Sequence, residues 1–193
     1  MECLGWGGYH QQMATFVLIP GAGGVAWYWH RIVPLLKDAK HQAIAVDLPG
    51  DDERAGLSAY ADRVVKAIGR RKDAILVAQS LGGFTAALVC DRVPIRMLVF
   101  LNAMIPLPGE TAGKWWDNTG STAARTAAAR HGGYSEKFDE ATYFLHDVSR
   151  SSWKANGTSV RRRTSCSPSL VISEHGPRFR STRSLGATIG SFP

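Results

Sequence analysis

The residues that point most directly to chemistry are Ala78-Gln79-Ser80-Leu81-Gly82-Gly83. They follow the apolar run 74–77 and precede a stretch typical of a helix, 84–91. A serine on a sharp turn between a strand and a helix is lifted clear of the sheet, where its hydroxyl can act as a nucleophile. Because that turn strains the backbone, the residues two before and two after the serine must be small. Ala78 and Gly82 meet this requirement, so the segment predicts a nucleophile at Ser80 rather than a serine that only caps a helix.

The predicted turn belongs to an alternation of strands and helices, which is typical of a parallel sheet covered by helices. Ser58 is expected to cap the second helix and Gly69 to end it. The fourth strand, Met97-Leu98-Val99-Phe100-Leu101, is apolar throughout and is therefore predicted to be buried on both faces. Strand patterns cover 15–19, 42–47, 74–79 and 96–101, and helix patterns cover 29–36, 58–68 and 84–91.

The chain is predicted to divide into an N-terminal extension (1–12), an α/β core (13–105), a partial helical lid (106–148) and a basic tail (149–193). The net charge of +7 comes from the tail alone, because residues 1–148 carry 15 basic and 15 acidic side chains. The tail carries 8 basic side chains, 1 acidic side chain and 11 serines, and its apolar periodicity fails, so it is expected to be disordered. Met13 is a candidate for the natural start of the protein.

Three further segments accompany the turn at Ser80 in a fixed order: Leu18-Ile19-Pro20-Gly21-Ala22-Gly23-Gly24, Ala26-Trp27-Tyr28-Trp29 and Val46-Asp47-Leu48-Pro49-Gly50. With these segments, residues 13–148 resemble the α/β-hydrolase fold family, in particular its branch of small esterases, methylesterases and hydroxynitrile lyases. The resemblance implies a three-layer sandwich, and a serine hydrolase that acts on a small ester through an acyl-enzyme at Ser80. It also implies that the backbone N–H groups of Ala22 and Leu81 form the oxyanion hole, and it calls for no metal or organic cofactor.

Four more residues are expected near the substrate. Gly21 and Gln79 flank the predicted oxyanion hole and nucleophile, and Trp115 and Trp116 could line an acyl pocket under the lid. The alternative for the two tryptophans is ordinary packing within the lid.

The acid and the histidine of the family's catalytic triad lie on loops after two further strands, for which this sequence offers no counterpart. Either a shift of reading frame or a wrong splice near codon 149 has replaced them, or a degenerate hydrolase carries a real basic appendage; the abrupt change of composition favours the first. The histidines His131, His146 and His175 are each expected to lie away from Ser80. A serine without a base is a poor nucleophile, so we predict turnover indistinguishable from background.

The segment Gly21-Ala22-Gly23-Gly24-Val25-Ala26 has a rival interpretation. It satisfies the G-x-G-x-x-A pattern of NAD(P)-binding Rossmann-type proteins, and Asp47 ends the next strand, where an acid would bind the ribose. Against this, Pro20 opens the loop and Trp27-Tyr28-Trp29 crowds the place of the pyrophosphate. In the hydrolase interpretation Asp47 only ends a strand and caps a turn.

Composition and short sequence patterns allow expectations about the localisation of the protein and about its binding partners. No apolar run approaches ~18 residues and no secretory signal is visible, so a cytoplasmic protein without a membrane partner is expected. The three cysteines, Cys3, Cys90 and Cys166, have neither disulfide nor metal spacing. Arg161-Arg162-Arg163 raises the hypothesis of nucleic-acid binding, but no interleaved aromatic residues support it. Without further strands the apolar fourth strand would be an exposed edge, through which self-association is expected.

Overall fold

The computed structural model describes residues 13–52, 54–144 and 146–147. The predicted extension, 1–12, and the predicted tail, 149–193, lie outside the described residues. The expectations placed on the Arg161-Arg162-Arg163 run, on His175 and on Cys166 therefore stay predictions.

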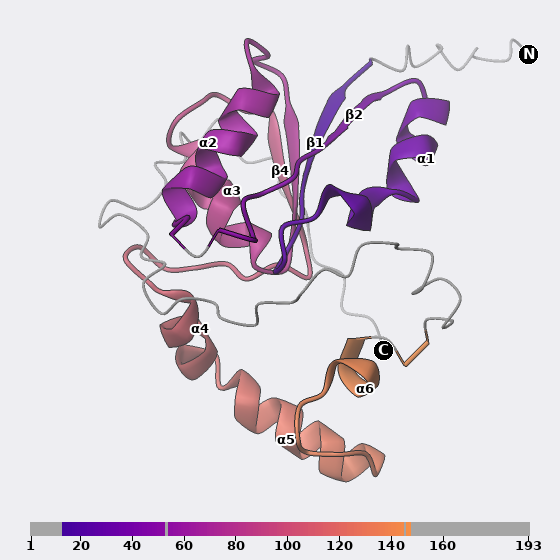
Figure 1. Ribbon diagram of the computed structural model, residues 1–193, viewed down its shortest axis with the longest axis vertical. Helices are drawn as coiled ribbons and strands as arrows, with labels where there is room; N and C mark the ends of the chain where they lie inside the picture. Colours follow the sequence, from indigo (N-terminus) through magenta and orange to yellow (C-terminus); the bar gives the residue numbers. More distant parts are fainter. Residues whose placement is uncertain (1–12, 53, 145, 148–193) are drawn as a thin grey trace, which may run out of the picture.

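A parallel sheet of four strands forms the centre of the structure (Figure 1). Parallel strands require crossover connections, which the intervening helices supply. All carboxyl ends lie at one edge of the sheet, so the loops after β1 and β3, which are adjacent strands, lie side by side. The strands are β1 (Thr15–Ile19), β2 (Gln42–Ala45), β3 (Ile75–Gln79) and β4 (Met97–Leu101), in the order β2-β1-β3-β4.

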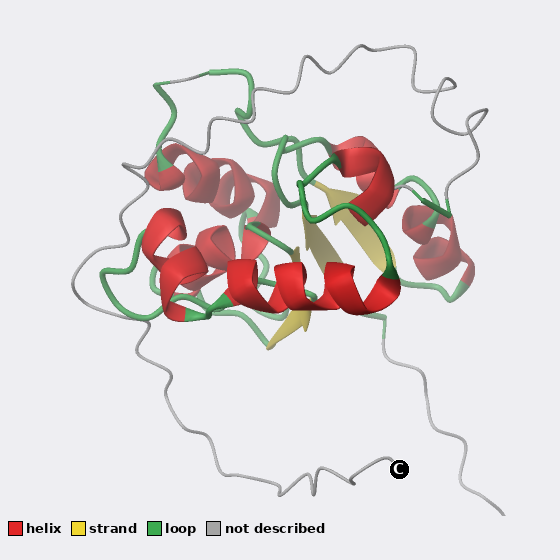
Figure 2. Ribbon diagram, turned by 90° about the horizontal axis from the view of Figure 1, so that it is seen from below, coloured by secondary structure: helices red, strands yellow, loops and turns green. Residues whose placement is uncertain are grey.

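Helices cover both faces of the sheet, as predicted, with α2 and α3 on one side and α1 on the other (Figure 1). The lid helices α4, α5 and α6 lie beyond the carboxyl ends of the strands, and in Figure 2 helices lie in front of the strands when this end is viewed. The elements are η1 (Ala26–Trp29), α1 (Ile32–Asp38), α2 (Leu57–Ile68), α3 (Gly82–Cys90), α4 (Ala112–Asn118), α5 (Ser121–Gly132) and α6 (Glu140–Phe144). No helix among the described residues has the length and apolar character needed to cross a bilayer.

Helices α2 and α3 make the core on their side of the sheet. The buried residues of α2 recur on one face of the helix: Leu57, Ala61, Val64 and Ile68. Helix α3 is buried from Gly82 to Val89 and is apolar on all sides, as expected of a helix enclosed by its neighbours.

The ends of α2 confirm one prediction and correct another. The helix ends at Gly69, whose φ of 62° is readily adopted only by glycine. Its N-cap is Gly56 rather than Ser58, and the Ser58 hydroxyl instead accepts a hydrogen bond from Arg92, which lies between α3 and β4 (3.0 Å).

Strand β4 contradicts the prediction that it is buried on both faces. Met97, Val99, Phe100 and Leu101 are exposed, and the exposed fraction of Met97 reaches 52%. Within the described part of the chain, β4 pairs only with β3, so its outer edge has no neighbouring strand. The expectation of an exposed apolar edge is confirmed.

Candidate active site

Ser80 occupies a strained turn between β3 and α3. Its φ is 51°, in the left-handed region, where a side chain costs roughly 1–2 kcal/mol. The turn is held from several directions, because the Ser80 carbonyl oxygen accepts hydrogen bonds from the N–H groups of Gly83 (3.1 Å) and Met104 (2.9 Å). The Ser80 N–H donates to the carbonyl oxygen of Leu101 (3.3 Å). The residue is only half-buried, so it does not lie in the packed interior.

Close contacts explain why the neighbours of Ser80 are glycines. A Cβ at Gly82 would lie 2.7 Å from the carbonyl oxygen of Pro20, and a Cβ at Gly83 would overlap the carbonyl oxygen of Met104. Helix α3 can therefore approach β1 and the chain after β4 only without side chains at these positions. A Cβ at Gly21 would lie 2.8 Å from the Cβ of Ser80, so the loop after β1 lies directly against the turn.

The loop after β1 is bonded to the residue before Ser80. The Gly21 N–H donates to the side-chain oxygen of Gln79 (3.2 Å). The structure thus brings Gly21, Gln79 and Ser80 together, but it engages the Gln79 oxygen with the loop rather than leaving it open to a substrate. Among the described residues, no acceptor is found for the N–H groups of Ala22 and Leu81. Free amides on the two sides of a serine turn are what an oxyanion hole requires.

The chain after β2 supports the same loop from the other side. The N–H of Leu48 donates to the carbonyl oxygen of Gly24 (2.7 Å), and the N–H of Ala26 donates to the carboxylate of Asp47 (2.7 Å). Asp47 therefore does more than end a strand, since its side chain fixes the end of the 21–26 loop. Sequence reasoning missed this contact because the partner is a backbone group 21 residues away.

The same contacts disfavour a dinucleotide site. The 21–26 loop leads into the short η1 and not into the N-terminus of an α-helix, on which a pyrophosphate would rest. The Asp47 carboxylate, which would have to bind a ribose, already accepts the Ala26 N–H.

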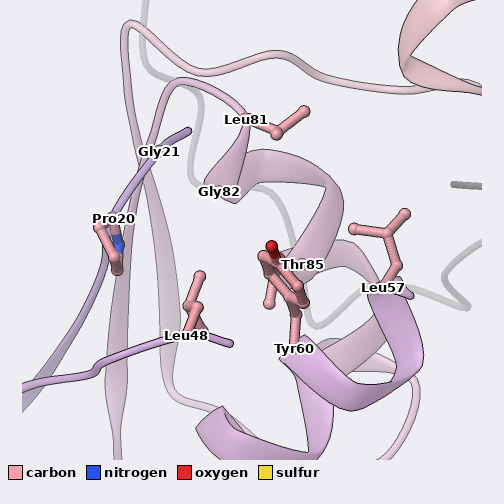
Figure 3. A pocket seen from close by; sticks show the side chains of 8 residues that line it. All are labelled: Pro20, Gly21, Leu48, Leu57, Tyr60, Leu81, Gly82 and Thr85. Atoms are coloured by element: carbon pink, nitrogen blue, oxygen red, sulfur yellow. The ribbon is translucent and has the colours of Figure 1, made fainter. Parts of the chain in front are cut away.

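An apolar hollow lies beside the turn (Figure 3). Leu81, which carries one of the two free amides, and Gly21, which precedes Ala22, form part of its wall, as does the buried Thr85. Its lining residues are Pro20, Gly21, Leu48, Leu57, Tyr60, Leu81, Gly82 and Thr85.

The two lid tryptophans have different environments, and neither lines this hollow. Trp115 packs against the core, and its indole N–H donates to the carbonyl oxygen of Ile105 (3.2 Å). Trp116 is 48% exposed and stands edge-on to Trp115, with ring centroids 5.2 Å apart. His131 and His146 are both exposed, and no contact between either and Ser80 is found in the described part of the chain.

Glu110, a buried acid in the lid, was not singled out by the sequence. Its carboxylate accepts hydrogen bonds from the Leu107 N–H (2.9 Å) and from the side-chain amide of Asn118 (2.6 Å). These contacts tie the turn before α4 to the end of that helix. The sequence gives no signal for this pair, because Glu110 and Asn118 are eight residues apart and meet only through the fold of the turn between them and the helix that follows.

Neither a reactive thiol nor a metal centre is found among the described residues. Burial, together with the charge of Asp91, raises the pKa of the Cys90 thiol to about 11. A thiol with that pKa is almost wholly protonated at neutral pH and is not a nucleophile. No cluster of side chains suited to a metal ion is found within 13–52, 54–144 and 146–147.

Comparisons with known proteins identify the family to which this fold belongs. A model described as the alpha/beta hydrolase family matches residues 16–186, and the chain belongs to that family of hydrolase enzymes. Relatives include an alpha-hydroxynitrile lyase of Arabidopsis thaliana, 34% identical over 54% of this chain and 47% of its own length. A probable esterase, PIR7A, of Oryza sativa subsp. indica is 34% identical over 51% of this chain and 42% of its own length.

A solved structure supports the same assignment. The crystal structure of polyneuridine aldehyde esterase superposes with a TM-score of 0.50 at 27% identity, covering 57% of this chain and 48% of that one. The chain spans less than half the length of each of these proteins. The hydrolase fold and family, rather than a Rossmann-type nucleotide-binding protein, therefore account for the glycine-rich loop.

Proposed function

We propose that the chemistry of this chain is that of a serine hydrolase acting on a small ester, with Ser80 as the nucleophile. The observation that carries the proposal is the positive φ of Ser80 in a turn pressed against Gly21. Strain of this kind persists only where the surrounding structure enforces it, and it is concentrated at functional sites.

In the proposed reaction the Ser80 hydroxyl oxygen attacks the ester carbonyl carbon. The new oxygen–carbon bond forms, the bond to the alcohol breaks, and the hydroxyl proton passes to the leaving alcohol by way of solvent water, because no side chain is assigned as the base. The Ala22 and Leu81 N–H groups bind the oxyanion of the tetrahedral intermediate. Water then hydrolyses the acyl-enzyme and regenerates Ser80.

The proposed substrate is a small ester. The hollow beside the turn has apolar walls but a volume of only about 10 Å³, which is room for about one water molecule, so the ester lies outside it, against Ser80. Two of the proteins compared above carry the word esterase in their names, which agrees with this substrate class. Gly21 contributes backbone only, because the space for a side chain is taken by Ser80.

The proposal includes a low rate for this chain. His131 and His146 are exposed lid residues, and we assign neither of them as the base. Catalysis that relies on binding and an oxyanion hole alone retains about 10³–10⁴-fold over water. We therefore expect ester turnover at the level of background.

Labelling with a fluorophosphonate tests the nucleophile directly, because the reagent reacts covalently with an activated serine. We expect slow modification that peptide mapping assigns to Ser80 and that Ser80→Ala abolishes. Modification elsewhere, or equal labelling of Ser80→Ala, would contradict the assignment. Labelling as fast as that of an intact esterase would contradict the low rate, and saturable binding of NADH would favour the rival nucleotide site.

A further inference from the structure

The loop after β1 begins with a tight turn that fixes the direction of the Ala22 N–H. The N–H of Gly24 donates to the carbonyl oxygen of Gly21 (3.2 Å), and Gly23 has a φ of 88°, as the third residue of a type II turn does. No cis peptide bond is found among the described residues. In a trans peptide the N–H of Ala22 points away from the carbonyl oxygen of Gly21, with which it shares a peptide plane. The hydrogen bond inside the turn therefore directs this N–H outward.

The chain after β2 holds the second half of the turn in place. The Gly24 carbonyl oxygen accepts the N–H of Leu48 (2.7 Å), and a Cβ at Gly24 would lie 3.0 Å from the Cβ of Leu48. A Cβ at Gly50 would lie 2.6 Å from the carbonyl oxygen of Gly23. The position of Gly24 therefore depends on how closely the segment after β2 lies against the loop.

Asp47 supplies the side-chain contact in this arrangement. Its carboxylate accepts the N–H of Ala26 (2.7 Å), two residues beyond Gly24. Asp47 also directly precedes Leu48, whose N–H holds Gly24, so the loop is bonded to the same short segment at two points. A hydrogen bond to a carboxylate is stronger than one between neutral groups, and this bond therefore contributes most where the loop would otherwise be free to move.

We propose that Asp47 is a positioning residue for the oxyanion hole, an inference that rests on the proposed function of Ser80. By holding Ala26, the Asp47 carboxylate keeps the loop against the chain after β2, so that the Ala22 N–H is already oriented when the oxyanion forms. Oxyanion donors act through such preorganisation, because no energy is then spent on orienting them during the reaction. The second donor, the Leu81 N–H, belongs to the turn before α3 and does not depend on this contact.

The rate at which a fluorophosphonate modifies Ser80 in the full chain tests this role, because the phosphonyl oxygen takes the place of the oxyanion. Asp47→Ala should lower the second-order rate constant about 10-fold, less than the 10²–10³-fold that complete loss of an oxyanion donor costs. Asp47→Asn keeps an acceptor oxygen without the charge and should be modified at close to the rate of the unmodified chain. Asp139→Ala is the matched control, because the exposed Asp139 carboxylate also accepts a backbone N–H, that of Thr142 (2.8 Å), but lies in the lid.

Amide NMR separates positioning from a general loss of stability. In the phosphonylated unmodified chain, the amide proton resonances of Ala22 and Leu81 should both move downfield, because both groups donate to the phosphonyl oxygen. In phosphonylated Asp47→Ala only the Leu81 resonance should move to the same extent, whereas a general destabilisation would alter both.

A second variant removes the same hydrogen bond from the donor side. Ala26→Pro lacks the N–H that Asp47 accepts, and proline is tolerated at the first position of a helix, which Ala26 occupies in η1. This variant replaces Asp47→Ala if circular dichroism shows that the latter does not fold, and the same loss of rate and of the Ala22 shift is expected.

The outcomes distinguish this role from the proposed function. If Ser80 of the unmodified chain is not modified, the proposed function is wrong and the role of Asp47 falls with it. If Ser80 is modified equally fast in Asp47→Ala, or if the Ala22 resonance of that variant still moves, Ser80 remains the nucleophile and the positioning role is overturned. A slow Asp47→Asn would also overturn it, since the charge and not the bond would then matter. An equally slow Asp139→Ala would assign the loss to stability and overturn it as well.

Discussion

The side-chain oxygen of Gln79 lies 3.2 Å from the backbone nitrogen of Gly21 and accepts its hydrogen. This bond joins the residue before Ser80 to the loop after β1, 58 residues away in sequence. It gives Gln79 a positioning role, since the adjacent peptide carries the Ala22 N–H that we propose as an oxyanion donor.

Replacing Gln79 should loosen this loop. Gln79→Leu removes the acceptor and leaves the Gly21 N–H without a partner, which should lower the free energy of unfolding by about 1–2 kcal/mol. Gln79→Glu keeps an acceptor oxygen and should cost less. Urea denaturation measures both, and hydrogen exchange at Gly21 should accelerate in Gln79→Leu only. Equal stability of the two variants would show that the bond does not hold the loop.

The backbone strain at Ser80 should lower the free energy of unfolding of the protein. Glycine adopts a φ of 51° without the penalty that a side chain incurs, so Ser80→Gly should be more stable than Ser80→Ala by about 1 kcal/mol. Both variants lack the hydroxyl and should resist the fluorophosphonate. Chemical denaturation compares the pair, and a Ser80→Ala protein as stable as Ser80→Gly would mean that the turn is not strained.

Gly21 should tolerate no side chain. The Cβ of Gly21→Ala would lie 2.8 Å from the Cβ of Ser80, so either the loop or the turn must move, at a cost of about 1–3 kcal/mol. Gly113→Ala is the control, since it lies in α4 with its nearest atom at 3.9 Å and should stabilise the protein by roughly 0.5–1 kcal/mol. Thermal melting distinguishes the two. A neutral Gly21→Ala would place the loop farther from Ser80 than the structure has it.

The Cys90 thiol should be protected from alkylation. Because its pKa is raised to about 11, at pH 8 the native protein should react with iodoacetamide ~100-fold more slowly at Cys90 than an unperturbed thiol of pKa 9.0 does. Mass spectrometry of the Cys90 peptide, from native and from urea-unfolded protein, measures the ratio. A native rate equal to the unfolded rate would contradict the burial.

The same pKa predicts a loss of stability at alkaline pH. The folded state holds the thiol proton more tightly than the unfolded state, so this contribution is complete below pH 9 and is lost as the pH rises toward about 11. Cys90→Ala should show a shallower decline over that range in urea denaturation. A decline of equal steepness in both proteins would assign the effect to other groups.

The parts of the structure that follow from local backbone requirements could be predicted from the sequence. The strand-to-helix turn at Ser80 needs small neighbours, and Gly69 at the end of α2 needs a positive φ. Both requirements can be recognised in the sequence, because each calls for particular residue types at particular positions. The order of strands and helices gave the parallel sheet for the same reason, since each element carries its own periodicity.

The parts that depend on distant neighbours could not be predicted. The apolar pattern of β4 is the same whether its edge is covered or open, so its exposure comes only from the sheet order. The pattern expected to give one helix over 29–36 is divided instead between η1 and α1, and only Trp29 of its apolar residues is buried. The partners of Gln79 and Asp47 are backbone groups, which leave no mark in the sequence.

Two consecutive residues, Met104 and Ile105, connect the turn at Ser80 with α4. The Met104 N–H holds the Ser80 carbonyl oxygen, and the carbonyl oxygen of Ile105 accepts the indole N–H of Trp115 in the first lid helix. If a substrate displaces α4, we expect the movement to reach the backbone that holds the Ser80 carbonyl oxygen. The orientation of the proposed nucleophile should then change together with the position of α4.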